Sequence, residues 1–388
     1  MFISSTRLPH VLPPFSYWAK AHYQRELEHL LLPAWHLVAC TEELARPGDF
    51  VTLELFGRPV QVRNFDGQLR ALSNVCAHRH CLLTHQPQGH SERMQCQYHG
   101  WEYGADGTPR RIPLPKNFAP FDARQERLEA YRVATCGQLV FVSLQAEGPD
   151  LQDYLGDVFD LVQERFGSCW RRSLAWSPSY PVNWKIPIEN SLEAYHVPYV
   201  HPKTFREDPG EARSSHCLEP HRTAFQTALP FSPHSRLDVW YQRCEGHVLR
   251  SLGVRPTGIY QQHHVFPNLL FSFTDAISLC HCVIPTGPKS AHAVVRQFGR
   301  CEQWGSVRRG VARLWGKLAA AVTRRILLED MALYPDIQRG LESSPHHGVL
   351  GRCEERIHAF QTYVQAAVDE ADVTTGHCMA AAEESNDD

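Results

Sequence analysis

The sequence predicts an α+β protein in which an all-β module precedes a larger part that combines strands with long C-terminal helices. From Trp35 to about Leu144, short segments alternate apolar and polar residues with period two, and hairpin turns are expected between them at Phe56-Gly57 and Asp66-Gly67. After Gly148-Pro149 helical and strand-like segments are mixed, and near the C-terminus apolar residues recur at helical spacing. The 388 residues are therefore expected to form two regions of different architecture.

Individual elements follow from the same patterns. Strands are expected at residues 50–55, 60–63, 69–73, 174–184 and, in several pieces, 221–295. Helices are expected at residues 17–32, 151–166, 304–341 and 354–370. In the third of these helices, the apolar residues at helical spacing are Val307, Val311, Leu314, Leu318 and Val322. The small, polar and acidic residues 374–388 predict a disordered tail.

Composition and charge limit the classes of function. Hydrophobic residues make up 43% and charged residues 21% of the chain, which are ordinary values for a globular protein. The formal net charge is −3 and no long Lys/Arg run occurs, so nucleic acid and membranes are not expected as partners. We find neither a secretory signal at residues 1–12 nor an apolar stretch of about 20 residues. Thirteen irregularly spaced cysteines favour reduced thiols, so a cytoplasmic protein is expected.

Two Cys–His pairs lie in the β module. Cys76 and His78 form C-x-H, and after seventeen residues Cys96 and His99 form C-x₂-H. Two thiolates suit one iron and two neutral imidazoles suit a second, which is the ligand set of a Rieske-type [2Fe–2S] cluster. Because each pair is expected at a tight turn between strands, two loops would hold one cluster from opposite sides.

A structural zinc site is the main alternative for these four residues. Zinc also accepts two Cys and two His, but usually from C-x₂₋₄-C and H-x₃₋₅-H pairs, so the mixed pairing argues against it. The neighbouring His80 and Cys81 fall at neither ligand spacing. We interpret Cys81 as a small buried residue and His80 as a group close to the cluster or the surface.

A second group of ligand-type residues follows Asn183-Trp184-Lys185. Glu193, His196 and His201 form the pattern E-x₂-H-x₄-H. If residues 189–197 are helical, Glu193 and His196 share one face, and Pro198 ends the helix so that His201 returns from the following turn. Two histidines with one carboxylate leave positions open on Fe(II), which is typical of enzymes that activate oxygen.

The carboxylate ligand need not be local, and an acidic pair occurs far downstream on the long C-terminal helix. An acidic residue on the apolar side of a helix is costly unless it faces a cation. We therefore predict Asp330 as the third metal ligand. Glu329 and Asp336 are alternatives on the exposed face.

With these motifs the sequence resembles the α subunits of Rieske oxygenases, which comprise ring-hydroxylating oxygenases and related demethylases. The resemblance extends from Trp35 to about Leu341. It rests on Asn74-Val75-Cys76-Ala77-His78-Arg79, Cys96-Gln97-Tyr98-His99-Gly100-Trp101, Asn183-Trp184-Lys185, Glu193-x₂-His196-x₄-His201, and Asp330 eight residues before Gln338.

The resemblance implies a Rieske [2Fe–2S] domain at residues 36–150. It also implies a catalytic mononuclear-iron domain at residues 1–35 and 151–373, built on a helix-grip antiparallel sheet. The implied cofactors are a [2Fe–2S] cluster and Fe(II). Members of the family form homotrimers in which the cluster of one subunit feeds the iron of its neighbour. The acid at the position of Glu193 bridges those two sites, which gives this residue a catalytic role.

The sequence departs from the family pattern at two positions. Glu193 stands where most members have Asp. Glu at this position is typical of the branch acting on quaternary amines such as choline, carnitine and glycine betaine. His80 replaces the Gly that usually follows Cys-x-His-Arg. This replacement leaves the four ligands intact but changes the surroundings of the cluster.

The predicted function is that of an oxygenase component acting with O₂ on a small organic substrate. The chain has no flavin or nicotinamide fingerprint, so electrons are expected from a separate NAD(P)H-dependent reductase or ferredoxin. Hydroxylation of a carbon that carries nitrogen would lead to N-dealkylation. The alternatives are an aromatic ring-hydroxylating dioxygenase and, from another class, a Rieske-type electron-transfer or zinc-binding protein.

Aromatic residues of the strand-rich region are candidates for the pocket wall, where aromatic faces can cage a trimethylammonium group. The same residues are more often found in the core of a sheet. The candidates are Trp240, Tyr241, Tyr260, Phe266, Phe271 and Phe273.

Overall fold

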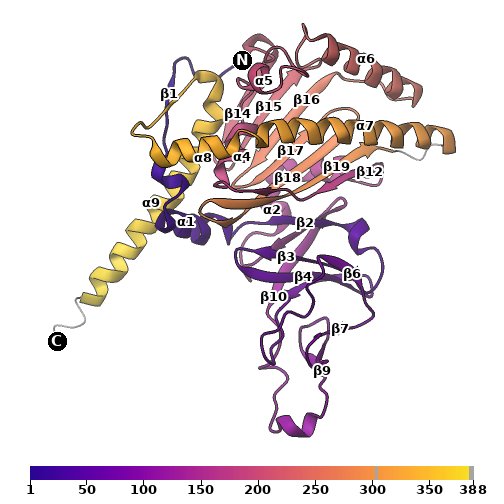
Figure 1. The fold of residues 1–388 in the computed structure, drawn as a ribbon, viewed down its shortest axis with the longest axis vertical. Coiled ribbons are helices and arrows are strands. Elements are labelled where there is room, and N and C mark those ends of the chain that lie inside the picture. The colour runs from indigo at the N-terminus through magenta and orange to yellow at the C-terminus, as the bar shows by residue number, and fades with distance from the viewer. Residues whose placement is uncertain (302–304, 384–388) are drawn as a thin grey trace. The chain divides into compact units, whose positions relative to one another are not determined.

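The computed structural model describes residues 1–301 and 305–383. It divides into two compact units, one formed by Leu32–Gln163 and the other by Met1–Leu31 with Glu164–Asp388. Every strand pair in both units is antiparallel within the described residues (Figure 1). Helices accompany the sheet of the second unit, so the predicted α+β class is confirmed.

The unit Leu32–Gln163 is built on a sheet of seven described strands in the order β2-β11-β10-β5-β4-β3-β6. The strands are β2 His36–Cys40, β3 Asp49–Leu55, β4 Arg58–Phe65, β5 Gln68–Ser73, β6 Gln88–His90, β10 Ala130–Cys136 and β11 Leu139–Ser143. Two hairpins close at Phe56-Gly57 and Asp66-Gly67, where all four residues have positive φ. Such φ values match the twist of paired strands, which explains why local turn residues predicted these hairpins correctly.

A smaller sheet, β7-β8-β9, completes this unit and carries the loop with Cys96 and His99. Its strands are β7 Met94–Gln95, β8 Glu102–Tyr103 and β9 Pro109–Arg111. The short helices of this unit are η3 Thr41–Leu44, η4 Pro115–Phe118, α2 Leu151–Leu155 and η5 Gly156–Val158. The helix α3 Phe159–Arg165 continues the chain, so the helix expected at 151–166 consists of three short helices.

The second unit contains a sheet with the order β12-β19-β18-β17-β16-β15-β14, and β13 also pairs with β19. The strands are β12 Trp170–Trp176, β13 Ser179–Tyr180, β14 Ser214–Glu219, β15 Arg222–Ala228, β16 Ile259–Val265, β17 Leu269–Phe273, β18 Ile277–Gly287 and β19 Ser290–Arg300. Figure 1 shows helix α7, Ser306–Met331, lying across this sheet, where it packs on β12 and β19.

Small residues allow α7 to approach the sheet closely. A Cβ atom on Gly299 of β19 would lie 3.3 Å from the Cα atom of Gly316 on α7. The buried side of this helix is formed by Ala312, Gly316, Ala319, Ala320 and Asp330. The larger apolar residues do not face the core, because Val307, Val311, Leu314 and Leu318 are all exposed.

The C-terminal helices differ from the expected ones in their limits. The helix expected at 304–341 is divided into α7 and α8 Tyr334–Ser343, and Trp304 lies outside the described residues. Pro335 stands in the first turn of α8, where its fixed φ suits a new helix. The last helix, α9 Glu355–Glu383, extends into the region where a disordered tail was expected, and residues 384–388 lie outside the described residues.

Helix α6, Arg236–Ser251, interrupts the region 221–295, where only strands were expected. The Ser235 hydroxyl caps the helix by accepting a hydrogen bond from the backbone N–H of Asp238 at 3.4 Å. Trp240 and Tyr241 suggested a strand because aromatic residues are common in sheets. This expectation was wrong because Ser235 starts a helix that contains both residues.

The N-terminal segment is also more divided than expected. In place of one helix at 17–32, the structure has η1 Pro14–Tyr17, α1 Lys20–Glu26 and the π-helical η2 Leu27–Leu31. A two-stranded sheet pairs β1 Leu8–Pro9 with β20 Val349–Leu350. The remaining short helices of this unit are α4 Lys185–Ser191, α5 Val197–Val200, η6 Glu211–Arg213 and η7 Arg352–Glu354.

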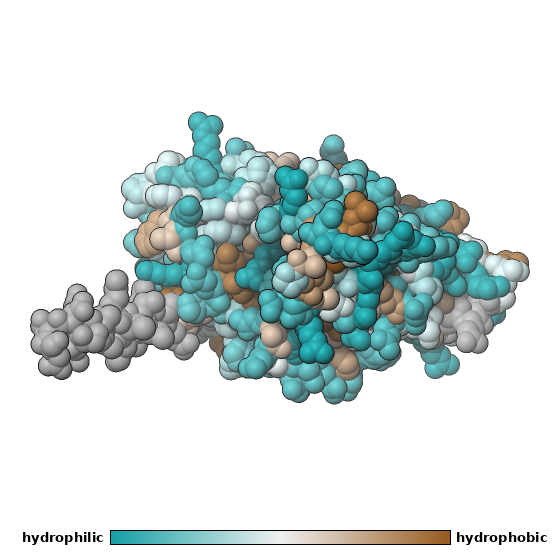
Figure 2. All heavy atoms as spheres, turned by 90° about the horizontal axis from the view of Figure 1, so that it is seen from below, coloured by the Kyte–Doolittle hydropathy of each residue, from teal (hydrophilic) through white to brown (hydrophobic). Residues whose placement is uncertain are grey.

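Hydrophilic side chains cover most of the face seen in Figure 2, and hydrophobic residues there form only small groups. None of the helices in the described part of the chain combines the length and apolar character needed to span a bilayer.

Candidate metal centres and cavity

Two loops of the unit Leu32–Gln163 carry the four residues predicted as cluster ligands. Cys76 and His78 follow β5, whereas Cys96 and His99 lie between β7 and β8. The first loop is closed by an isolated bridge and the second by the β7–β8 pair. Two turns of similar build therefore present one Cys–His pair each.

The two loops have the same backbone hydrogen bonds. In the first, the N–H of Cys76 donates to the O of Cys81 at 2.9 Å, and the N–H of His80 donates back to the O of Cys76 at 3.0 Å. In the second, the N–H of Cys96 donates to the O of Trp101 at 2.8 Å, and the N–H of Gly100 donates back to the O of Cys96 at 3.0 Å. His80 and Gly100 occupy equivalent left-handed positions, with φ of 57° and 72°. His80 thus adopts the conformation that glycine reaches most easily.

The side chains of the two loops separate into a thiol pair and an imidazole pair. Cys76 and Cys96 are buried and their thiols interact. The rings of His78 and His99 have centroids 4.7 Å apart, and the His78 ring stacks on Trp101 at 4.8 Å. Grouping like ligands in this way suits two irons, one held by sulfur and one by nitrogen, better than a single zinc ion.

Polar groups around this site fit a bound cluster. The hydroxyl of Tyr103 lies 3.0 Å from Cys76 Sγ and accepts a hydrogen bond from the N–H of Ala77 at 3.1 Å. Burial raises the pKa of the Cys76 thiol, so this thiol is neutral until a metal ion takes the place of its proton. The Nδ1 atom of His78 is buried and has no hydrogen-bond partner among the described residues. A metal ion would satisfy this nitrogen.

The second group of ligands is placed by the short helix α5. His196 precedes α5 and His201 follows it. The continuous helix expected at 189–197 is not observed, because α4 ends at Ser191 and Glu193 lies in the irregular segment between α4 and α5. Pro198 does not end a helix as expected. It stands in the first turn of α5, where a missing N–H costs no helical hydrogen bond.

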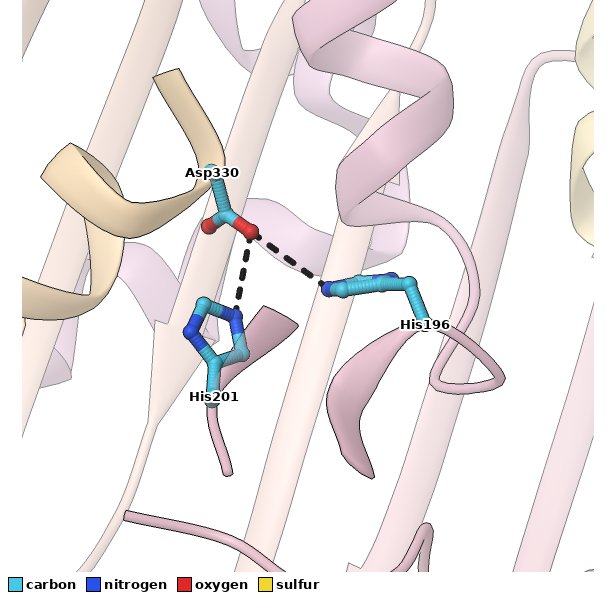
Figure 3. Close-up of side chains that lie close together, drawn as sticks. All are labelled: His196, His201 and Asp330. Atoms are coloured by element: carbon cyan, nitrogen blue, oxygen red, sulfur yellow. Dashed lines mark ion pairs between the residues drawn. The ribbon is translucent and has the colours of Figure 1, made fainter. Parts of the chain in front are cut away.

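The structure brings His196, His201 and Asp330 together, although Asp330 comes from the distant helix α7. Figure 3 shows the two imidazoles and the carboxylate pointing toward one another. Asp330 Oδ1 lies 3.5 Å from His196 Nε2 and 3.0 Å from His201 Nε2. One ligand atom from each residue lies within 4.8 Å of those of the other two. This spacing allows all three to coordinate one metal ion.

Hydrogen bonding on the far side of each ring explains why a cation fits between them. His196 Nδ1 faces the Glu193 carboxylate, and His201 Nδ1 lies 2.9 Å from Glu329 Oε2. A neutral imidazole that donates from Nδ1 presents a lone pair at Nε2. The buried Asp330 Oδ1 has no hydrogen-bond partner among the described residues. Three electron-rich atoms thus converge on a point where a metal ion is the natural partner.

The two alternatives to Asp330, Glu329 and Asp336, lie outside the group of three ligand atoms. Glu329 does not join the three ligand atoms but holds the outer nitrogen of His201, and Arg325 Nε donates to it at 3.0 Å. Asp336 is exposed on α8. Burial alone would lower the pKa of His201, but the carboxylates of Asp330 and Glu329 outweigh burial and raise it. A more basic imidazole is a stronger metal ligand.

A cavity of about 360 Å³ adjoins these three residues in the second unit. Of the aromatic candidates, Tyr260 and Phe273 line it. Phe266 and Phe271 are buried in the core instead, Trp240 is exposed, and Tyr241 packs on Trp315. Lining residues that the sequence analysis missed include Phe225, Phe231, His281 and Arg356.

The sequence contains one signal that could have revealed Arg356. This residue precedes Phe360 and Val364 at intervals of four along α9, and both of these residues are fully buried. An arginine on the apolar stripe of a helix is unusual, because burial of a charge is costly.

Models of known protein families match residues in both units. A model of the Rieske [2Fe–2S] domain matches residues 34–132. A model of the ring-hydroxylating alpha subunit (catalytic domain) matches residues 168–370, more than half of the chain.

Curated relatives include enzymes of two kinds. The large oxygenase component of the naphthalene 1,2-dioxygenase system of Pseudomonas aeruginosa is 33% identical over 192 residues, which is 47% of this chain and 43% of the relative. Chloroplastic choline monooxygenase of Spinacia oleracea is 26% identical over 378 residues, which is 91% of this chain and 77% of the relative. The match thus spans less than half the length of the first dioxygenase relatives.

Solved structures show the same fold. The quaternary ammonium Rieske monooxygenase CntA superposes with a TM-score of 0.74 at 19% identity, covering 92% of this chain and 95% of CntA. Naphthalene 1,2-dioxygenase from Rhodococcus sp. superposes with a TM-score of 0.72 at 18% identity, covering 92% and 94%. Both domain matches and the shared fold lead to one conclusion: the chain belongs to the ring-hydroxylating α-subunit family of Rieske oxygenases.

Proposed function

We propose that the chain is the oxygenase component of a Rieske non-haem iron oxygenase, which hydroxylates a small organic substrate with O₂. The observation that carries this proposal is the convergence of His196, His201 and Asp330 beside a cavity of about 360 Å³. Electrons come from a separate NAD(P)H-dependent reductase or ferredoxin. The fold and its relatives support this assignment, because the solved neighbours include mono- and dioxygenases.

In this proposal the chain holds two cofactors. Cys76, Cys96, His78 and His99 hold the [2Fe–2S] cluster, and His196, His201 and Asp330 hold Fe(II). When bound, these centres supply the electron transfer and oxygen chemistry that hydroxylate the substrate. Glu193 and Glu329 orient the two iron-site imidazoles from outside. The apolar cavity wall positions the substrate and excludes water.

Two substrate classes are compatible with the family, and we favour quaternary amines. The choline monooxygenase match extends over 91% of the chain, and CntA is named as a quaternary ammonium enzyme. Hydroxylation next to nitrogen then yields an aldehyde and a dealkylated amine. Aromatic ring dihydroxylation is the second candidate, because naphthalene dioxygenase components are 33% identical over the matched part.

A product screen tests the reaction. Purified protein is incubated with a surrogate reductase, NADH, O₂ and a mixed panel of quaternary amines and aromatic acids, and products are identified by mass spectrometry. We expect an oxygenated or dealkylated product from wild type and none from His196→Ala, His201→Ala or Asp330→Ala. These variants should lose the mononuclear iron while the cluster spectrum remains. Retained iron and turnover in Asp330→Ala would overturn the assignment of that ligand.

The cluster assignment has its own test. Wild-type protein isolated without oxygen should be brown and contain acid-labile sulfide. Cys76→Ser and Cys96→Ser should abolish the colour, whereas the matched control Cys81→Ser should keep it, because the Cys81 thiol is directed to Leu82 O, 3.4 Å away. A colourless wild type loaded with zinc would rule out the cluster.

Larger features of the proposal rest on the family resemblance. We propose residues 36–150 as the Rieske domain and residues 1–35 with 151–373 as the catalytic domain, which the two compact units support. We further propose a cytoplasmic homotrimer in which Glu193 links the cluster of one subunit to the iron of the next. Inter-subunit electron transfer has been described for CntA, which supports this arrangement.

A further inference from the structure

Arg356 is a buried cation in the wall of the cavity. Its side chain is 1% exposed, although it belongs to the first turn of α9. Of the described residues that line the cavity, it is the only Arg or Lys. Burial lowers its pKa to about 10, so the guanidinium remains charged at neutral pH.

The protein contacts of this guanidinium are all neutral. Arg356 Nε donates to Thr223 Oγ1 at 3.3 Å, Nη1 to Leu192 O at 3.3 Å and Nη2 to Gln262 Oε1 at 2.8 Å. The group also lies over the Phe225 ring, 5.7 Å from its centroid. No ion pair with an Asp or Glu occurs among the described residues.

This lack of a counter-charge is unusual for so deep a position. Lys185, which is equally buried, lies 2.5 Å from Glu26 Oε1. A buried charge without an opposite charge is costly, and such positions are normally paired. Arginine has five N–H donors, and the contacts above use three of them. Two donors of Arg356 therefore remain for a ligand in the cavity, which Leu192, Phe225 and Gln262 also line.

We propose that Arg356 binds a carboxylate of the substrate and thereby selects small organic acids, including betaines, over neutral or purely cationic compounds. This inference rests on the proposed oxygenase function of the same cavity. The planar guanidinium fork matches the two oxygens of a carboxylate. The apolar body of the acid packs against aromatic residues of the wall, which include Phe225, Phe231 and Tyr260.

The charges around the cavity fit a zwitterion in one orientation. Acidic side chains at the cavity wall are Glu193, Asp208, Glu211 and Asp330. Glu211 is paired with Arg352, Glu193 with His196, and Asp330 faces the two histidines. If the substrate is a betaine, its carboxylate lies at Arg356 and its ammonium group faces Asp208. The carbon next to nitrogen is then directed away from the guanidinium.

A binding experiment tests the inference without turnover. Iron-loaded wild type is titrated under anaerobic conditions by calorimetry with two matched pairs of probes, glycine betaine against choline and anthranilate against 2-aminobenzamide. Each pair differs in the carboxylate and retains the rest of the skeleton. We expect at least one acid to bind about 10- to 100-fold more tightly than its partner, which corresponds to charge-assisted hydrogen bonds.

Variants identify the residue responsible. Arg356→Gln should remove the preference for the acid, and Arg356→Lys should keep the charge but restore only part of the affinity, because the fork is lost. Arg222→Gln on the neighbouring strand β15 is the matched control and should bind like wild type, since Arg222 pairs with Glu219 outside the cavity. Melting temperature and iron content verify the fold of each variant.

The outcomes separate this inference from the proposed function. If no acid binds more tightly than its partner, or if Arg356→Gln keeps the preference, Arg356 is not a carboxylate site. The wild-type comparison decides the question even if the variants fail to fold. Selective binding of an acid without any product in the screen would instead contradict the oxygenase assignment and leave the carboxylate site intact.

Discussion

His201 illustrates how a single contact assigns roles to neighbouring residues. Glu329 and Asp330 are adjacent in sequence, and both are acidic. The helical geometry of α7 directs Asp330 to His201 Nε2 and Glu329 to His201 Nδ1. One imidazole is therefore held between two carboxylates, one on the metal side and one behind the ring. The outer carboxylate fixes the tautomer in which Nε2 is free to bind a metal ion.

This arrangement predicts that Glu329→Gln weakens Fe(II) binding about 10- to 100-fold, because outer carboxylates of metal-bound histidines contribute this much. The amide can still accept a hydrogen bond but carries no charge, so His201 becomes less basic. Fe(II) titration of the apo-protein, followed by iron content after gel filtration, measures the change. Asp336→Asn is the control because Asp336 is exposed and outside the group. Equal affinity of Glu329→Gln and wild type would show that the contact is incidental.

The predictable part of the site consists of residues whose chemistry is specific and whose spacing is short. Two Cys–His pairs and the pattern E-x₂-H-x₄-H reveal candidate ligands without any knowledge of the fold. The role of Glu329 could not be predicted, because it depends on which side of α7 faces a loop 128 residues earlier. Arg356 was missed for the same reason, since its partners come from three distant segments.

At the scale of elements, the motif Asn183-Trp184-Lys185 joins several segments of the second unit. The side chain of Asn183 donates to Pro288 O at 2.8 Å, and its N–H donates to Gln338 Oε1 on α8 at 2.8 Å. Trp184 Nε1 and Lys185 Nζ both reach the carboxylate of Glu26 on α1, at 2.9 and 2.5 Å. The motif thus has a structural explanation, because it fastens α1 and α8 to the start of α4.

Lys185→Met should therefore destabilise the protein by about 3–5 kcal/mol, which is the usual cost of leaving a buried charge without its partner. The remaining Glu26 is fully buried, and Met replaces only the aliphatic part of the lysine. Urea unfolding followed by circular dichroism measures the loss. The double variant Lys185→Met with Glu26→Leu should regain much of the stability, because neither charge of this pair is left in the core. A single variant as stable as wild type would argue against this account.

Local signals also decided which elements were predictable. The hairpins at Phe56-Gly57 and Asp66-Gly67 were predicted correctly because Gly57 and Gly67 readily adopt the positive φ that such turns require. The helix expected at 189–197 was wrong because its spacing also suits two short helices separated by a turn. The exposed stripe that contains Val307 and Leu314 could not be told from a core stripe, since periodicity shows a shared face and not what covers it.

At the scale of the whole molecule, the chain divides its predicted chemistry between two units. The four predicted cluster ligands lie in Leu32–Gln163, and the three predicted iron ligands lie in the other unit. Oxygenase turnover requires electrons to pass from one centre to the other. Glu193 is the residue that we propose for this passage. Its carboxylate contacts the Nδ1 atom of His196 and accepts a hydrogen bond from the backbone N–H of His196 at 3.0 Å.

When loaded with saturating Fe(II), Glu193→Gln should hold both metals and a reducible cluster but lose turnover, because the bridging group no longer carries a charge. The assay is a single turnover in which the pre-reduced cluster is mixed with substrate and O₂, and its reoxidation is followed by absorbance. Glu193→Asp is the control, since it keeps the carboxylate and should restore part of the rate. The alternative is a purely structural role, in which Glu193 only accepts the hydrogen bond from the backbone N–H of His196. Reoxidation of the Glu193→Gln cluster at the wild-type rate would establish that role, because electrons would then cross without the carboxylate.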